Sequence, residues 1–376
     1  MSVERVRRMV IKVGTATIAE GSGRISSERI RTLVGQIAEA RLRGIDVALV
    51  SSGAIASGTE KLGLERRPGD IQALQAVSAV GQGLLMQMYA GLFADSGITT
   101  GQVLLTRFDM THRQQYLNAR HTFEHLFEMG VVPVINENDT VATEEITFGE
   151  NDILAALVAA LVGADLLVLL TDTRGLYTAD PSTEGGARLL ERVERITEEI
   201  EGFGGDAGSR LASGGMSSKV QAVKTAIASG VSSVIADGRS QNIIVDILDG
   251  KQVGTYFPAA GKELRSKKHW IGYAMQSRGR LVIAAGAARA VRNNGKSLLP
   301  VGVLSVDGDF QAGDAVDIVD PDGVIIGRGL VNYGCLEAAR IKGLRSTQVA
   351  ELLGETAEEI IHRDCLVVFE DSDDTD

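Results

Sequence analysis

The chain of 376 residues lacks any apolar run of the roughly 20 residues that a membrane-spanning helix needs. It has two cysteines, Cys335 and Cys365, too few and too far apart for a metal motif or a disulfide framework. Its first residues show no small-residue cleavage site of a signal peptide. These absences argue against membrane-spanning and disulfide-rich classes, and we expect a protein of the reducing cytoplasm.

Composition indicates a globular protein, with 44% hydrophobic and 23% charged residues. The length suffices for two or three domains. The net charge of −11 is uneven, because residues 265–354 carry 12 Lys and Arg against 8 Asp and Glu, whereas residues 355–376 carry 9 acidic residues and Arg363 alone. This imbalance suggests a basic module followed by an acidic tail, although ordinary surface charge beside a frayed terminus explains the same counts.

The most informative stretch is residues 131–172, where apolar runs flank a polar loop. Residues 131–135 and 166–170 are typical of buried parallel strands, and residues 153–162 are long enough for the crossover helix. Ligands of open parallel sheets bind outside the carboxyl ends of the strands. We therefore predict a site for a small polar ligand in the loop, whose polar residues are Asn136, Asn138, Asp139, Glu150, Asn151 and Asp152.

Lys12 lies within the first predicted strand, residues 8–13, where a cation is costly unless it meets an anion. Either it contacts a phosphate at the carboxyl end of the strand, or it lies on an exposed edge. The next predicted strand, residues 46–50, is followed by Ser51-Ser52-Gly53-Ala54. Small residues there let a ligand approach the backbone, but a plain strand-to-helix turn has the same composition.

A second candidate phosphate site is the glycine-rich turn at residues 213–219, which precedes a helical pattern over residues 220–229. Paired glycines, hydroxyl groups at the helix start and Lys219 in its first turn suit a phosphate group. The turn is not a P-loop, because the pattern GxxxxGK[ST] occurs nowhere in the chain. A glycine-rich turn without a ligand is the alternative, and the presence of Lys12 at another element end favours the phosphate site.

Helical periodicity also covers residues 27–43 and 74–92, and strands are predicted over residues 98–105, 233–236 and 253–256. Beyond a charged segment at residues 262–268, short strand candidates occupy residues 280–285, 302–306, 315–319 and 324–329. Asp-Gly, Gly-Asp and Pro-Asp-Gly turns separate them, as in a small barrel or sandwich.

In order and spacing, six segments resemble the glutamate 5-kinases, a group within the amino-acid kinase family. They are VIKVGTATI, SSGAIASG, INENDTVATEEITFGEND, LLTDTRGLYTADP, GGMSSK and SLLPVGVLSVDGDF. The resemblance implies a three-layer αβα sandwich with a mostly parallel sheet over residues 1–262. It further implies a linker over 263–274, a small PUA-like β-barrel over 275–354 and an acidic tail over 355–376.

The resemblance implies ATP-dependent phosphorylation of the side-chain carboxylate of L-glutamate, the first step of proline biosynthesis from glutamate. The implied catalytic residues are Lys12, Lys219 and Asp152, with Mg²⁺ held by the ATP phosphates and no metal ligand assigned to the protein. Glutamate binding is assigned to Ser52, Asp139, Asn151 and Asn136. ATP binding is assigned to Lys12, Thr171, Asp172, Ser213, Gly214, Gly215, Met216, Ser217, Ser218 and Lys219.

Feedback inhibition by proline, a homodimer or homotetramer, and delivery of the labile product to a glutamyl phosphate reductase are also implied. RNA binding is the competing hypothesis, because PUA-like modules are best known from RNA-modifying proteins. Against it, the aromatic residues Trp270, Tyr273, Phe310 and Tyr333 are scattered rather than interleaved with basic residues. Another amino-acid kinase, acting on aspartate, acetylglutamate or a nucleotide, would share the sheet and both lysines, but the INENDTVATEEI segment argues against it.

Overall fold

The computed structural model describes residues 6–21, 23–111, 113–141, 150–179, 181, 186–203, 215–259, 277–353 and 359–369. The chain divides into two compact units, one made of Met1–Phe108 and Asn118–Glu263, the other of Asp109–Leu117 and Leu264–Asp376. The predicted linker, residues 263–274, lies outside the described residues. In the described part of the chain, every helix is too short or too polar to cross a membrane.

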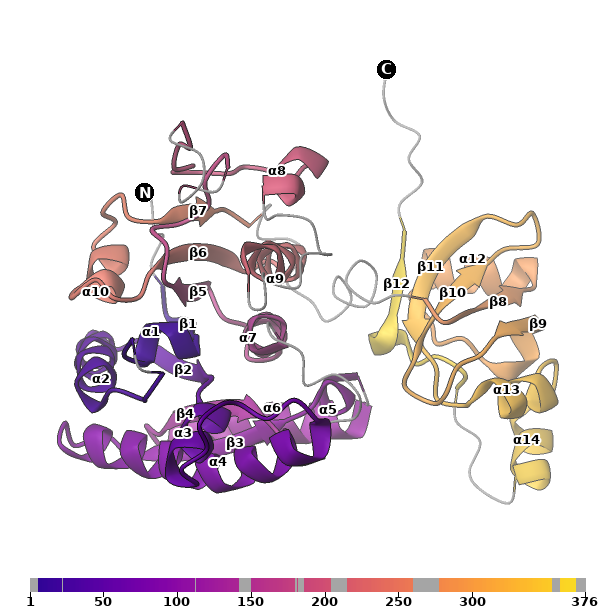
Figure 1. Ribbon diagram of the computed structural model, residues 1–376. Coiled ribbons are helices and arrows are strands. Elements are labelled where there is room, and N and C mark those ends of the chain that lie inside the picture. The colour runs from indigo at the N-terminus through magenta and orange to yellow at the C-terminus, as the bar shows by residue number, and fades with distance from the viewer. Residues whose placement is uncertain are drawn as a thin grey trace. The chain divides into compact units, whose positions relative to one another are not determined.

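A seven-stranded sheet organises the first unit (Figure 1). Its spatial order is β3 (Thr100–Leu105), β4 (Val132–Glu137), β2 (Asp46–Ser51), β1 (Arg8–Val13), β5 (Leu166–Thr171), β6 (Ser232–Asp237) and β7 (Thr255–Phe257). All neighbours in this sheet are parallel except β7, which pairs antiparallel with β6. The carboxyl ends of β1, β2, β4 and β5 therefore share one edge, where ligands of parallel sheets bind.

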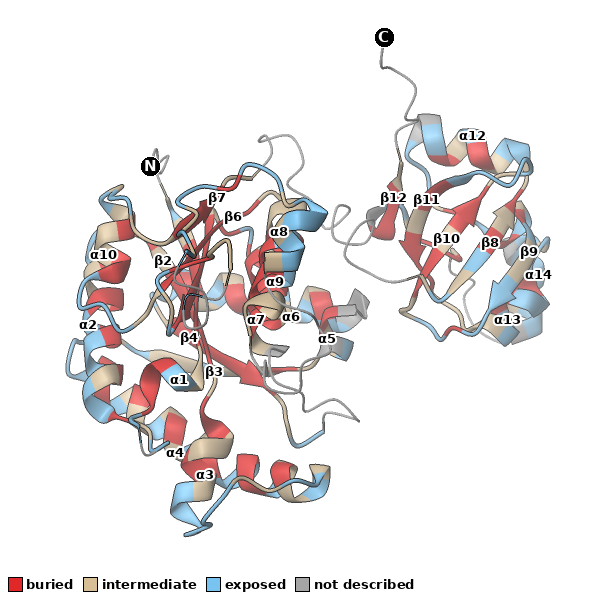
Figure 2. Cartoon of the chain, turned by 45° about the horizontal axis from the view of Figure 1, so that its top comes forward, coloured by how far each residue is buried: buried red, intermediate tan, exposed pale blue. Residues whose placement is uncertain are grey.

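Helices cover both faces of this sheet, and its strands are buried between them (Figures 1 and 2). On one face lie α2 (Ser27–Leu42), α4 (Ile71–Ala94) and α10 (Ile243–Leu248), whose residues Ile37, Leu85 and Ile244 join a common core. On the other face, α7 (Glu150–Leu161) and α9 (Met216–Ala228) pack against β1, β5 and β6. The predicted αβα sandwich with a mostly parallel sheet is confirmed.

Further helices are described between β1 and β7 in the sequence. They are α1 (Thr15–Ile18), α3 (Ala54–Lys61), α5 (Arg107–Thr111), α6 (Arg113–Glu128) and α8 (Glu198–Phe203). Of these, α3 follows the Ser51-Ser52-Gly53 turn directly, so the predicted strand-to-helix connection after β2 is present.

The two-residue period of β1 explains the position of Lys12. Met9, Ile11 and Val13 belong to the core that includes α2, whereas Val10 and Lys12 alternate with them and face the layer of α7. Because β1 pairs with β2 on one side and β5 on the other, Lys12 is not on an exposed edge. The alternative of an edge lysine is therefore wrong.

Glycine allows α3 and α4 to approach each other closely. A Cβ atom added at Gly81 of α4 would lie 1.8 Å from the carbonyl oxygen of Ala54 and 2.4 Å from the amide nitrogen of Gly58, both in α3. These are backbone atoms, which cannot turn aside as a flexible side chain can. The contact therefore holds α4 against the turn that carries Ser52.

The second unit contains a five-stranded mixed sheet in the order β12 (Leu366–Val368), β11 (Ile325–Leu330), β10 (Ala315–Val319), β8 (Gly279–Ile283) and β9 (Val303–Gly308). Strands β10 and β8 are parallel, and the other pairs are antiparallel. The helices α12 (Ala285–Asn294), α13 (Cys335–Ile341) and α14 (Ser346–Leu353) supply Val291, Ile341 and Val349 to the core around Phe310. The turn pattern of the sequence predicts β8, β9, β10 and β11, but neither β12 nor these helices.

Part of the predicted acidic tail, residues 355–376, belongs to this sheet. Leu366 of β12 lies opposite Gly329 of β11, and Ile360 and Ile361 are fully buried in the core. The tail prediction is therefore wrong for residues 359–369. The prediction rested on the surplus of acidic residues and did not consider two short apolar runs among them. Residues 370–376 lie outside the described part of the chain.

We expect Gly81→Ala to destabilise the first unit by roughly 1–3 kcal/mol, because the added methyl group overpacks the α3–α4 contact. Gly83→Ala is the matched control, since a Cβ atom there would meet nothing within 4 Å and alanine has the higher helix propensity, by up to about 1 kcal/mol. Urea denaturation followed by circular dichroism measures both. Equal unfolding midpoints for the two variants would contradict the close contact.

Candidate active site

The side chains of Lys12 and Lys219 converge on Asp152, forming a group that we call the lysine–aspartate cluster. Lys12 comes from β1, Asp152 from the first turn of α7 and Lys219 from the first turn of α9. Lys12 Nζ lies 2.5 Å from Asp152 Oδ1, and Lys219 Nζ lies 3.3 Å from Asp152 Oδ2. None of the three residues is more than 5% exposed. The structure thus brings the three predicted catalytic residues together.

Electrostatics in the cluster favour an ionised carboxylate. Burial lowers the pKa of Lys12 and the charge of Lys219 lowers it further, while Asp152 opposes both effects. Burial alone would raise the pKa of Asp152, but the positive charges of the two lysines and the hydrogen bonds that it accepts outweigh this and lower it. When both lysine side chains are charged, the cluster carries two positive charges and one negative charge, all buried. This net positive charge favours the binding of an anion beside the cluster.

The described part of the predicted phosphate-binding turn forms the start of α9. Gly215 precedes the helix, and the first turn comprises Met216, Ser217, Ser218 and Lys219. Ser218 Oγ lies within hydrogen-bond distance of Asp152 Oδ2 (2.8 Å) and of the Gly215 carbonyl oxygen (2.9 Å). Since amide groups at a helix start attract phosphate, Ser218 ties a candidate phosphate site to the cluster. Ser213 and Gly214 lie outside the described residues.

Thr171 and Asp172, both predicted to bind ATP, lie at the carboxyl end of β5. Thr171 Oγ1 donates a hydrogen bond to Asp172 Oδ1 at 3.2 Å. Thr171 pairs with Asp237 of β6. The guanidinium group of Arg239 donates to the Asp172 carbonyl oxygen and lies 3.3 Å from Asp237 Oδ1. Both predicted residues therefore lie on the same sheet edge as Lys12. Asp237 of β6 and Arg239, just after β6, contact them.

A chain of neutral hydrogen bonds connects three of the predicted glutamate-binding residues. Asn151 Nδ2 donates to Ser52 Oγ and to Asn136 Oδ1, both at 2.9 Å. Asn136 Nδ2 donates in turn to Gln82 Oε1 of α4, also at 2.9 Å. Because Asn151 precedes Asp152 in the first turn of α7, this polar chain adjoins the lysine–aspartate cluster.

Asp139, the fourth predicted glutamate-binding residue, lies in the turn after β4. Its Oδ2 accepts a hydrogen bond from Ser78 Oγ of α4 at 2.5 Å. Burial raises the pKa of Asp139, and the Ser78 hydroxyl and the positive charge of Arg67 counteract part of that rise. A partly buried carboxylate with a raised pKa gains from a nearby cation, so Asp139 suits an ammonium group of a ligand.

Sequence reasoning missed Ser78 and Gln82. They are four residues apart in α4, and such residues lie on the same side of a helix. That side reaches Asp139 and Asn136 at the end of β4. The signal in the sequence is a pair of polar residues one turn apart in an apolar helix, which periodicity alone assigns to the solvent side.

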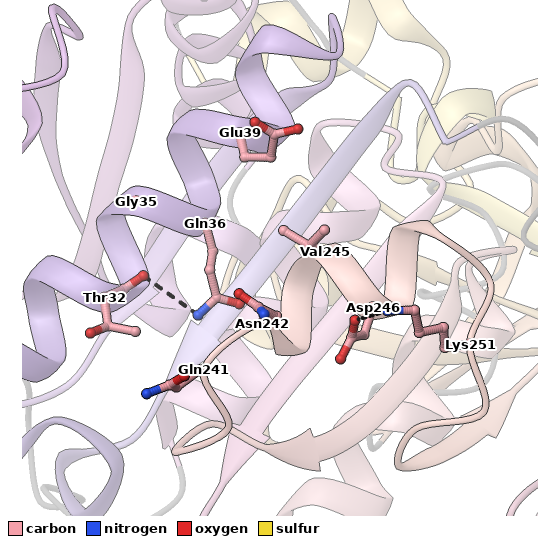
Figure 3. Close-up of a pocket in the computed structure, with 9 residues that line it drawn as sticks. All are labelled: Thr32, Gly35, Gln36, Glu39, Gln241, Asn242, Val245, Asp246 and Lys251. Carbon is pink, nitrogen blue, oxygen red and sulfur yellow. Dashed lines mark hydrogen bonds and ion pairs between the residues drawn. The ribbon is translucent and has the colours of Figure 1, made fainter.

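A separate pocket of about 450 Å³ lies between α2 and α10 (Figure 3). Its lining includes Gln36, Asn242, Asp246 and Lys251. Lys251 pairs with Asp246 at 2.6 Å, and Gln36 Oε1 accepts a hydrogen bond from the amide of Ile244 at 2.9 Å. The pocket is on the α2–α10 face of the sheet, opposite the layer of α7, and contains none of the predicted site residues. We therefore locate the candidate site at the lysine–aspartate cluster.

Both parts of the chain resemble known proteins. Residues 7–237 match the amino acid kinase family, and residues 279–353 match the PUA domain. A glutamate 5-kinase of Moorella thermoacetica is 47% identical over 370 residues, with 98% of each chain covered. A glutamate 5-kinase of Syntrophus aciditrophicus is 44% identical over 368 residues, with 98% of this chain and 95% of that protein covered.

Among solved structures, a UMP kinase from Bacillus anthracis matches with a TM-score of 0.47 and 14% identity, over 69% of this chain and 98% of its own. The family match spans more than half of the chain, and the two glutamate 5-kinases are similar over nearly its full length. By these two findings, the chain belongs to the amino acid kinase family.

Proposed function

We propose that this protein transfers the γ-phosphoryl group of ATP to the side-chain carboxylate of L-glutamate, as the first step of proline biosynthesis. The observation that carries the proposal is the buried lysine–aspartate cluster, which adjoins the polar chain of Ser52, Asn136 and Asn151. The cluster suits phosphate groups and the polar chain suits an amino acid. Relatives at 44–47% identity that are named glutamate 5-kinase support the choice of substrate.

The reaction needs charge neutralisation rather than a general base. A glutamate side chain has an ordinary pKa of about 4.3, so its carboxylate is already ionised at neutral pH. One of its oxygens forms a bond to the γ-phosphorus while the bond from that phosphorus to the bridging oxygen breaks, and ADP leaves with the electron pair. The obstacle is repulsion between two anions, which Lys12 and Lys219 reduce, while Asp152 holds both ammonium groups in position.

Magnesium accompanies the nucleotide in this proposal. In the described part of the chain, no group of three His, Cys, Asp or Glu side chains could hold a metal ion. Both carboxylate oxygens of Asp152 face lysine ammonium groups and are therefore engaged. We therefore assign the metal ion to the ATP phosphates rather than to protein side chains. Bound there, Mg²⁺ would add positive charge at the phosphoryl group.

Recognition of glutamate is assigned to both charged and neutral groups. Asp139 would receive the α-ammonium group, which an N-acetylated glutamate lacks. Ser52 and Asn151 would contact the amino acid from the end of β2 and the start of α7. Proline also carries an ammonium and a carboxylate group, so we propose that it inhibits by competing for the same residues.

RNA binding by the second unit stays a hypothesis. Phe310, one of the four aromatic residues considered for a stacking platform, is 1% exposed and part of the core. Tyr333 also packs against that core. Trp270 and Tyr273 lie outside the described residues. Of these four aromatic residues, the two described ones are thus buried or partly buried, which does not support a stacking platform for RNA bases.

The proposed reaction is tested by ADP release from ATP and Mg²⁺ with L-glutamate, L-aspartate or N-acetyl-L-glutamate as acceptor. We expect L-glutamate to be preferred over both, because Asp139 would attract a free ammonium group, which the acetylated amine lacks, and relatives named glutamate 5-kinase favour the longer side chain. Hydroxylamine added to the reaction should convert the acyl phosphate into a hydroxamate. Equal rates with all three acceptors, or ADP without hydroxamate, would argue against the proposal.

We expect Lys219→Ala to lower kcat by about 100-fold or more, because in the proposed reaction it removes a positive charge that would stabilise the transferred phosphoryl group. The KM for glutamate should change by less than about threefold. Lys224→Ala is the matched control, since Lys224 is on the same helix but half exposed and paired with Glu201 at the surface. Equal losses in kcat and in glutamate affinity would rule out the catalytic role of Lys219.

A pH dependence follows from Asp139, whose pKa is raised by burial. Only the ionised carboxylate attracts the ammonium group of glutamate, so kcat/KM should fall as the pH drops through that raised pKa, before an ordinary aspartate becomes protonated. In Asp139→Asn this fall should disappear, while the KM for glutamate rises by at least about tenfold at neutral pH. Superimposable pH profiles for the two proteins would show that Asp139 does not bind the ammonium group.

A further inference from the structure

The hydrogen bonds around Asn151 have a fixed direction. Its amide nitrogen has two hydrogens, and they are donated to Ser52 Oγ and to Asn136 Oδ1. Asn136 can accept in this way because its own nitrogen points the other way, towards Gln82 Oε1. The acceptor atom Gln82 Oε1 on α4 therefore sets the orientation of the Asn136 amide, and through it that of Asn151.

This direction decides which groups are left for a ligand. Ser52 Oγ already accepts a hydrogen bond, so its single hydrogen remains to be donated. Asn151 Oδ1 is buried, and no described residue donates a hydrogen bond to it. The chain thus ends in one hydroxyl donor and one amide acceptor, side by side. An amino acid zwitterion needs a donor for its carboxylate and an acceptor for its ammonium group.

Reversing the chain would exchange the positions of the free donor and the free acceptor. If the Asn136 amide turned over, its nitrogen would face the nitrogen of Asn151, and two donors would oppose each other. Asn151 would then turn over as well, and its oxygen would accept the Ser52 hydroxyl. Ser52 Oγ would then have only lone pairs left for a ligand and Asn151 only hydrogens, so the free donor and the free acceptor would change places.

We infer that Gln82 is a positioning residue, which fixes the direction of this hydrogen-bond chain and so sets where the site offers a donor and where it offers an acceptor to a zwitterionic amino acid. The inference rests on the proposed function, because it concerns the glutamate pocket. Gln82 does not touch the reacting atoms but acts through Asn136 and Asn151. The backbone that carries Gln82 is held against α3, because Gly81, the preceding residue, packs against the backbone of that helix.

Two substitutions distinguish the hydrogen-bond acceptor of Gln82 from the size of its side chain. Gln82→Met keeps the length of the side chain but removes the acceptor, so we expect the KM for L-glutamate to rise roughly fivefold to tenfold, the effect of one neutral hydrogen bond. The KM for ATP and kcat should stay within about twofold. Gln82→Glu can only accept at this position, so it should keep the KM for glutamate within about threefold of the wild type.

The control is Gln87→Met, the same substitution at an exposed position of α4, which should leave all three constants unchanged. Steady-state ADP release by the full-length protein gives the constants, and thermal unfolding shows whether each variant is folded. An unchanged KM for glutamate in Gln82→Met, or a loss as large in Gln82→Glu, would overturn the role of Gln82. Wild-type protein that releases no ADP with L-glutamate would instead overturn the proposed function, and this inference with it.

Discussion

One carboxylate between two ammonium groups is the interaction on which the rest of the site depends. Asp152 is fully buried, and its two oxygens face lysines from β1 and α9. Breaking a buried ion pair by removing one partner typically costs about 3–5 kcal/mol, so this contact fastens a strand and two helices to each other. The same contact leaves two positive charges against one negative charge. The interaction that joins the elements therefore also prepares a place for an anion.

The alternation of side chains along β1 allows one strand to serve both the core and the site. Met9, Ile11 and Val13 pack into the apolar layer with α2, while Lys12 faces α7. Because β1 is central in the sheet, its carboxyl end lies between the turn after β2 and the end of β5. A lysine at that point reaches a buried carboxylate without giving up any contact of the apolar layer.

Local sequence predicts the elements well because each carries its own pattern, as β1 and α4 illustrate. The residues of the candidate site could be predicted where they end a strand or begin a helix, as Lys12, Ser52 and Lys219 do. Gln82 could not, since its partner is fixed only when α4 packs beside β4. The strand and buried residues within 359–369 could not be predicted for a related reason. Acidic residues surround two short apolar runs there, and these runs have packing partners only in the folded unit.

Adjacent residues at the start of α7 couple the two halves of the site. Asp152 takes part in the charged cluster, and Asn151, one residue earlier, takes part in the neutral chain that begins at Gln82. A peptide unit is rigid, so the neutral groups that would orient the amino acid cannot move far without moving the charges that would receive the phosphoryl group. In-line transfer between two anions requires their alignment as well as their neutralisation. In the proposed reaction, joining both tasks to one helical turn would supply this alignment through the backbone.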